Sequence, residues 1–114
     1  MKTEDLEKII NEAFNDKQNI SEASDSKIIN AIKETIELTD IGNIRVAEKK
    51  NGKWLVNQWI KKAILLSFRI NKMVMSKGPY TTWYDKVPGK SVSWSETDWK
   101  KAGYRHVPNG VVRK

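Results

Sequence analysis

Apolar residues repeat at helical spacing over the first third of the chain, and this pattern constrains the fold more than any other feature. In residues 4–16 the repeated positions are Leu6, Ile9, Ile10, Ala13 and Phe14. Intervals of three and four place these side chains on one face of a helix and the charged residues on the other face. We therefore predict an amphipathic helix over residues 4–16 that packs against a core.

A second helix is predicted to follow, with Ser24 or Asp25 as its N-cap and Gly42 just beyond its end. Its apolar face would carry Ile28, Ile29, Ile32 and Ile36. We interpret both apolar faces as core, and a groove for a partner is the alternative.

The pattern changes after Gly42 to one that is typical of a β-hairpin. Asn51-Gly52, a pair that tolerates positive φ, separates extended segments at 44–48 and 54–56. Asn57 is then predicted to cap a third helix at about 58–70. The apolar residues of that helix are too numerous for an exposed position, so we expect it to be the centre of the packing.

The rest of the chain gives weaker signals. Residues 72–93 contain Gly78-Pro79 and Pro88-Gly89, which favour irregular backbone or short extended segments. Ser95 and Asp98 resemble a capping box at the start of a short helix that Gly103 would end. The predicted fold class is α+β and mainly α, a single small helical domain with one β-hairpin.

Several classes of function are excluded or disfavoured by residue counts. The absence of Cys excludes disulfides, thiolate nucleophiles and thiolate zinc sites. His106 is the only histidine and has no catalytic motif around it, so we expect a surface or satisfied core histidine, no catalytic residue and no metal site. The acidic amino terminus and short apolar runs fit neither a secretory signal nor a membrane span, and a cytoplasmic location is expected.

Positive charge is concentrated in the second half of the chain. Residues 1–57 contain 9 Lys and Arg against 11 Asp and Glu, whereas residues 58–114 contain 12 against 3. A basic surface of this kind attracts polyanions, phosphorylated cofactors or dicarboxylates, and charge alone does not separate them.

Two motifs in the basic half combine aromatic side chains, charges and a proline, at residues 83–88 and 103–108. In the second motif Arg105 follows the expected helix stop at Gly103. A guanidinium is a planar fork of donors that matches a carboxylate, so Arg105 could bind an acidic substrate. The plain alternative for each motif is a packed aromatic loop, with Arg105 as a surface residue.

Five segments in the same order and spacing resemble the tetrahydrodipicolinate N-succinyltransferase family. They are residues 45–49 (RVAEK), 51–54 (NGKW), 58–70 (QWIKKAILLSFRI), 84–88 (YDKVP) and 103–105 (GYR). The resemblance covers nearly the whole chain and identifies residues 1–114 as an amino-terminal helical domain. No single segment is decisive, but five in register over about 70 residues do not arise by chance.

The resemblance implies a homotrimeric acyltransferase that moves a succinyl group from succinyl-CoA to tetrahydrodipicolinate in diaminopimelate and lysine biosynthesis. It implies that Arg105 binds the dicarboxylate substrate, with Tyr84, Lys86 and Tyr104 as possible neighbours in the site. The family continues into a left-handed β-helix of hexapeptide repeats, which is absent from these residues together with the coils that hold coenzyme A. We therefore expect no bound cofactor and no acyl transfer from this chain alone, whether it is a fragment or a stand-alone relative.

Two other functions stay open. The basic half with its interleaved tryptophans could form a nucleic-acid-binding module, through phosphate contacts and base stacking. A regulatory domain that pairs with other trimers is the third hypothesis. No membrane partner is expected.

Overall fold

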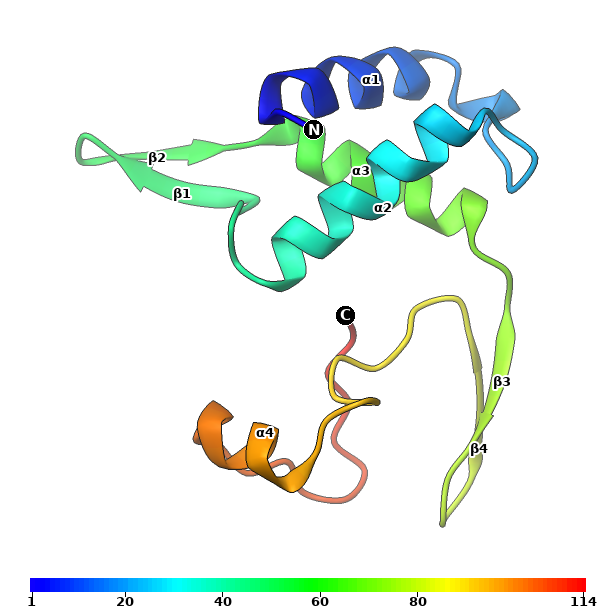
Figure 1. Ribbon diagram of the computed structural model, residues 1–114, viewed down its shortest axis with the longest axis vertical. Helices are drawn as coiled ribbons and strands as arrows, with labels where there is room; N and C mark the ends of the chain where they lie inside the picture. Colours follow the sequence, from blue (N-terminus) through cyan, green and yellow to red (C-terminus); the bar gives the residue numbers. More distant parts are fainter.

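A layer of three helices forms the upper half of the molecule in Figure 1, and an open arrangement of a hairpin, a short helix and loops lies below it. This computed structural model describes residues 1–114. The elements are α1 (Thr3–Asn15), a 3-10 turn η1 (Lys17–Asn19), α2 (Ser26–Asp40), β1 (Ala47–Lys50), β2 (Lys53–Val56), α3 (Gln58–Ile70), β3 (Val74–Lys77), β4 (Thr82–Asp85) and α4 (Glu96–Ala102). The α+β, mainly helical fold class is confirmed, and the sheets are two separate two-stranded hairpins.

The three long helices pack against one another around a single apolar core. The helix α3 contributes the most buried residues to it, namely Trp59, Ile60, Ala63, Leu66, Ser67 and Ile70. The predicted apolar faces of α1 and α2 bury Leu6, Ile10 and Ile32 completely. The prediction that α3 is the central packing element is therefore confirmed.

The ends of α2 form as predicted, whereas the start of α3 forms differently. Asp25 is the N-cap of α2, where its Oδ1 accepts a hydrogen bond from the Lys27 amide at 2.7 Å. Asn57 occupies the N-cap position of α3, but its side chain makes no capping hydrogen bond. Its Nδ2 instead donates to the Arg45 carbonyl oxygen at 2.7 Å and to Glu48 Oε1 at 3.1 Å. The prediction of a capping side chain is wrong, because this amide joins the base of the first hairpin.

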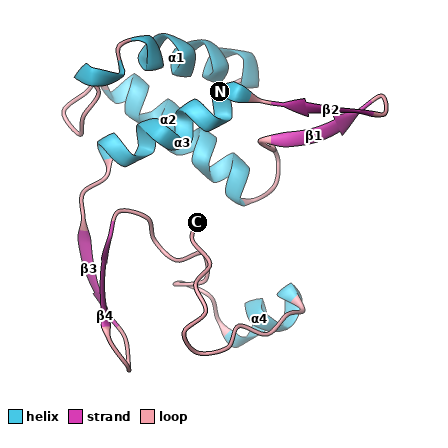
Figure 2. Cartoon of the chain, turned by 180° about the vertical axis from the view of Figure 1, so that it is seen from behind, coloured by secondary structure: helices cyan, strands magenta, loops and turns pink.

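The first hairpin, β1–β2, projects from one end of the helical layer, and residues 47–56 are called the arm below (Figure 2). Its turn contains Asn51 and Gly52, both at positive φ as expected of this pair. The paired strands begin at Ala47, so residues 44–46 connect α2 to the arm without joining the ladder. The predicted hairpin is confirmed with a shorter first strand.

A second hairpin, β3–β4, forms where irregular backbone or short extended segments were predicted. Its register pairs Met75 with Tyr84 and Ser76 with Trp83. The Trp83 ring lies against Gly78, where a Cβ atom would be only 2.3 Å from the ring. The missing side chain of Gly78 therefore gives the indole its place beside the turn, a tertiary effect that turn propensity does not reveal.

The part of the chain after α3 has no buried core of its own. Every buried residue lies between Leu6 and Ile70. The Cα radius of gyration is 16.2 Å, compared with about 13 Å for a compact chain of this length. Residues 71–114 therefore extend from the helical layer and leave many large apolar side chains exposed. None of the helices combines the length and apolar content that crossing a bilayer requires.

Candidate anion-binding site

The short helix α4 fixes the position of the loop that carries Arg105. Ser95 and Asp98 form a capping box, in which the Ser95 amide donates to Asp98 Oδ2 at 2.8 Å and Ser95 Oγ accepts from the Asp98 amide at 3.3 Å. The hydrogen bond from the Ser95 amide holds the pKa of Asp98 below its usual value. Gly103 ends the helix with φ of +73°. Both predicted boundaries of this helix are confirmed, and the backbone leaves it two residues before Arg105.

An aromatic cluster supports the same loop from one side. The ring centroid of Trp99 lies 4.8 Å from that of Trp94, 5.6 Å from that of Tyr104 and 5.5 Å from that of His106. The two residues that flank Arg105 are therefore held by ring contacts, which are worth about 0.5–1.5 kcal/mol per aromatic pair. Arg105 itself is exposed and takes part in no ion pair of the structure. Its guanidinium is available to an external carboxylate.

His106 is half-buried, and its Nε2 atom is shielded from solvent without a hydrogen-bond partner. The backbone at Gly110 lies so close that a Cβ atom there would be 2.9 Å from this nitrogen. This differs from the expected surface or satisfied core histidine. His106 packs as a ring beside Trp99 and adds no partner for Arg105.

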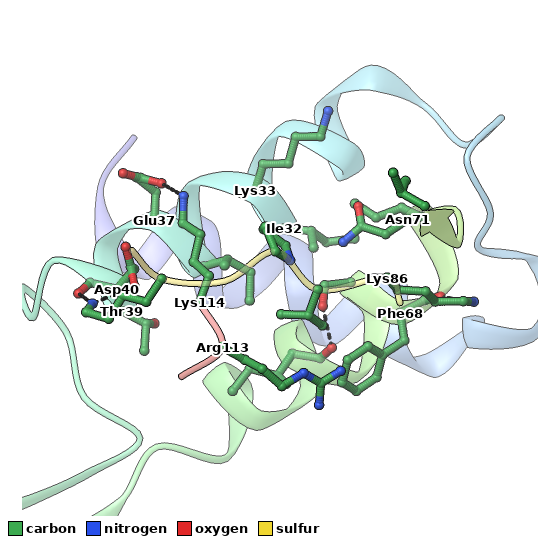
Figure 3. Close-up of a pocket in the computed structure, with 18 of the residues that line it drawn as sticks. Ile32, Lys33, Glu37, Thr39, Asp40, Phe68, Asn71, Lys86, Arg113 and Lys114 are labelled. Carbon is green, nitrogen blue, oxygen red and sulfur yellow. Dashed lines mark hydrogen bonds and ion pairs between the residues drawn. The ribbon is translucent and has the colours of Figure 1, made fainter. Parts of the chain in front are cut away.

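A groove of about 800 Å³ lies between the helical layer and the returning carboxy-terminal segment (Figure 3). Helices α2 and α3 form one wall, with apolar side chains that include Ile32 and Phe68. Basic side chains gather along the groove, from Lys33, Lys72, Lys86, Lys90, Arg113 and Lys114. Two acids, Glu37 and Asp40, also line it. The groove is therefore cationic as a whole.

Ion pairs to the end of α2 occupy part of this positive charge. Lys90 Nζ lies 2.7 Å from Asp40 Oδ1 and also donates to the Asp40 carbonyl oxygen at 3.0 Å. Lys114 Nζ lies 2.5 Å from Glu37 Oε2. The hydrogen bond to Glu37 raises the pKa of Lys114. These contacts fasten the carboxy-terminal segment to the last turn of α2.

A third fastening joins β4 to the carboxy terminus and to α3. Asp85 accepts a hydrogen bond from the Lys86 amide at 2.7 Å and pairs with Arg113 Nη2 at 2.9 Å. The Lys86 amide, followed by the charge of Arg113, holds the pKa of Asp85 below its usual value. Lys86 Nζ donates to the Phe68 carbonyl oxygen at 2.7 Å (Figure 3). Lys86 is thus used in a contact within the chain.

The four residues predicted for the substrate site lie on separate parts of the structure. Lys86 lines the groove, whereas Tyr84 is an exposed residue of β4 and does not line it. Tyr104 and Arg105 follow α4, which lies on the opposite side of the lower half from β4 (Figure 1). The structure does not gather these residues around one cavity, so the site assignment stays a prediction.

The groove itself was not predicted from the sequence. Its unpredicted cations are Lys90, Arg113 and Lys114, which meet acids far away in the chain. The basic bias of residues 58–114 and the acids at the end of α2 are the only signals in the sequence. No group of three or more His, Asp or Glu side chains is placed to hold a metal ion.

Comparisons with known proteins agree with this architecture. A family model described as "Tetrahydrodipicolinate N-succinyltransferase N-terminal" matches residues 5–70, from α1 to the end of α3. A protein of Pelagibacter ubique is 51% identical over 113 residues, which cover 96% of this chain and 41% of that protein. Proteins of Bartonella tribocorum and Mesorhizobium japonicum are 49% and 48% identical, over 95% and 96% of this chain and 39% of each relative.

All three relatives carry the name 2,3,4,5-tetrahydropyridine-2,6-dicarboxylate N-succinyltransferase. This chain spans about two fifths of their length. The aligned region extends well beyond residue 70 and so includes most of the open part of the structure.

Proposed function

Because the chain belongs to the tetrahydrodipicolinate N-succinyltransferase family, we propose that it is the substrate-facing amino-terminal domain of an enzyme that transfers a succinyl group from succinyl-CoA to tetrahydrodipicolinate. The pathway proposed for this enzyme is diaminopimelate and lysine biosynthesis. The acceptor in the printed name of the relatives is a pyridine dicarboxylate, and a diacid is a ligand for which a cationic surface is suited.

The observation that carries the proposal is the unpaired guanidinium of Arg105. It lies between two residues that contact Trp99, two positions after the left-handed Gly103, and no carboxylate of the chain pairs with it. A guanidinium with a fixed backbone and no internal partner binds an incoming carboxylate with a smaller entropic cost than a flexible one. The planar fork donates two parallel hydrogen bonds to the two carboxylate oxygens.

The role of Arg105 in this proposal is positioning and not proton transfer. Arginine stays protonated at every physiological pH and so cannot act as a base. Succinyl transfer requires the acceptor nitrogen to attack the thioester carbonyl, and the coenzyme A thiol then leaves. Holding the acceptor by its carboxylate keeps this nitrogen close to the thioester, and such proximity accounts for a large part of many rate enhancements.

The remaining parts of the proposed site belong to the rest of the enzyme. We propose that a β-helix supplies the acidic partner of the site and the binding surface for coenzyme A, in a cytoplasmic homotrimer. The missing core of residues 71–114 supports this view, because apolar side chains such as Met75 and Tyr84 are then available for packing against another part of the protein. On this basis the isolated chain binds no cofactor and transfers no succinyl group.

Equilibrium binding to the full-length enzyme tests the proposal. Calorimetry with a pyridine dicarboxylate should show weaker binding by about tenfold or more for Arg105→Ala, because a charge-assisted hydrogen-bonded pair is lost. Arg45→Ala is the matched control, since Arg45 is also exposed and forms no ion pair. Equal affinities for wild type and Arg105→Ala would refute the role of Arg105.

A further inference from the structure

The arm is an extended structure that nothing in the chain covers. Trp54 is 73% exposed and Val56 is 45% exposed, on a ladder of only four residue pairs. An isolated two-stranded hairpin is marginally stable in water. Here Asn57 anchors its base through the hydrogen bonds to Arg45 and Glu48. The arm is therefore held in a projecting position without the packing that normally stabilises such a hairpin.

One face of the arm combines apolar and cationic side chains. The register pairs Ala47 with Val56 and Lys49 with Trp54, and directly opposed residues share a face. Lys53 adds a further charge at the tip, and neither Lys49 nor Lys53 forms an ion pair within the chain. Lys50 is the exception, because it pairs with Glu48 at 3.2 Å. The free charges of the tip are thus positive and lie beside an exposed indole.

The outward face of α1 has the opposite character. Its exposed acids are Glu4, Asp5, Glu7 and Glu12, and none of them pairs with a cation of the chain. Lys8 is the only basic residue among them. The arm points away from the helical layer, and its tip lies beyond the ends of all three helices (Figures 1 and 2). The lysines of the tip therefore do not reach the acids of α1 in the same copy.

We propose that the arm of one copy docks on the outward face of α1 in a second copy. Lys49 and Lys53 would meet the free carboxylates, and the docked helix would cover Trp54. Each copy has one arm and one acidic face, so the contact is head-to-tail, and it forms a ring if the rotation between copies closes. The inference rests on unpaired charges and exposed surface of this chain and is independent of succinyl transfer.

Sedimentation of the 114-residue chain in low salt tests this contact. We expect a mass above that of the monomer, which returns to the monomer as salt screens the charges. Lys49→Glu with Lys53→Glu should weaken the association by about tenfold or more, because two attractive contacts become repulsive. Lys61→Glu with Lys77→Glu has the same net charge at exposed positions away from the arm and should have a much smaller effect.

A charge exchange makes the test specific. The arm variant should associate again when it is mixed with a chain that carries Glu4→Lys and Glu12→Lys. Carbodiimide cross-linking of a mixture of ¹⁴N and ¹⁵N chains should join Lys53 to an acid of α1 between copies. Circular dichroism of each variant shows that the helical layer is folded.

Three outcomes would overturn the proposal. They are a monomer at every concentration in low salt, equal weakening by the arm and control variants, and cross-links within one copy only. A monomer whose arm binds single-stranded DNA in a salt-dependent way would also overturn it and would assign the arm to nucleic acid instead.

Discussion

Lys90 joins the returning chain to the end of α2 through two contacts with a single residue, Asp40. Its ammonium lies 2.7 Å from Asp40 Oδ1 and 3.0 Å from the Asp40 carbonyl oxygen. Asp40 is the last residue of α2, where unpaired carbonyl groups and the helix dipole favour a cation. One lysine thus satisfies both a carboxylate and a helix terminus, and it fixes where the open part of the chain meets the helical layer.

Replacing Lys90 with Met should loosen this attachment and leave the core intact. The pair is partly exposed, so we expect a loss of about 1 kcal/mol or less, which corresponds to an opening about fivefold more frequent. The measurement is hydrogen exchange at the amides of Lys90 and Lys114, which donate to Val112 and Pro88. Unchanged exchange at both amides, or faster exchange throughout α3, would contradict this account.

The contact between β4 and the carboxy terminus should weaken in acid. The pKa of Asp85 lies below its ordinary value of 3.8 in the folded chain. Its ionised form therefore stabilises the contact at pH values above 3.8, and this stabilisation is lost as the pH falls from there through the lower folded pKa. NMR of the Arg113 side chain should report the change, and Asp85→Asn should remove it. A transition that persists in Asp85→Asn would assign it to another group.

Stability should depend on the helical layer and hardly at all on the open part. Ile60 is fully buried, so Ile60→Ala should cost about 2–5 kcal/mol of unfolding free energy. Met75 is 59% exposed, and Met75→Ala should change that free energy by about 0.5 kcal/mol or less. Urea unfolding followed by circular dichroism compares the two. Equal losses would show that the second hairpin belongs to the cooperative core.

Removing the cap of α4 should disturb Arg105 at a distance. Ser95→Ala removes the side-chain acceptor of the capping box, at a cost of about 1 kcal/mol, and α4 buries no residue that would compensate. We expect faster hydrogen exchange at the Trp99 amide, which donates to the Ser95 carbonyl oxygen. Ser95→Thr keeps an acceptor and serves as the control. The prediction fails if both variants exchange like the wild type.

Local signals were sufficient for the helices and the first hairpin, because periodic apolar residues and caps act over a few positions. Asp25 and Gly103 illustrate this, since each ends or begins a helix through its own backbone or side chain. Contacts between distant residues were not predictable in the same way. Lys114 meets Glu37 across 77 positions, and many other lysines would fit an acidic partner equally well in the sequence.

Asn57 shows how two local signals compete. As a residue before a helix it is suited to capping, but it also borders the hairpin, and its amide can donate to the Arg45 carbonyl oxygen. The second use forms because the chain turns back on itself between the arm and α3. The location of Arg105 followed from a family resemblance, and its exposure and lack of a partner became known only from the structure.

Steady-state kinetics of the full-length enzyme with Arg105→Ala test the central claim most directly. We predict that the KM for the dicarboxylate rises by about tenfold or more while the KM for succinyl-CoA changes little, because only one of the two substrates loses its guanidinium partner. Arg45→Ala should leave both values near those of the wild type. An unchanged KM for the dicarboxylate, or an equal rise for both substrates, would contradict the assignment of Arg105 as the residue that binds the diacid.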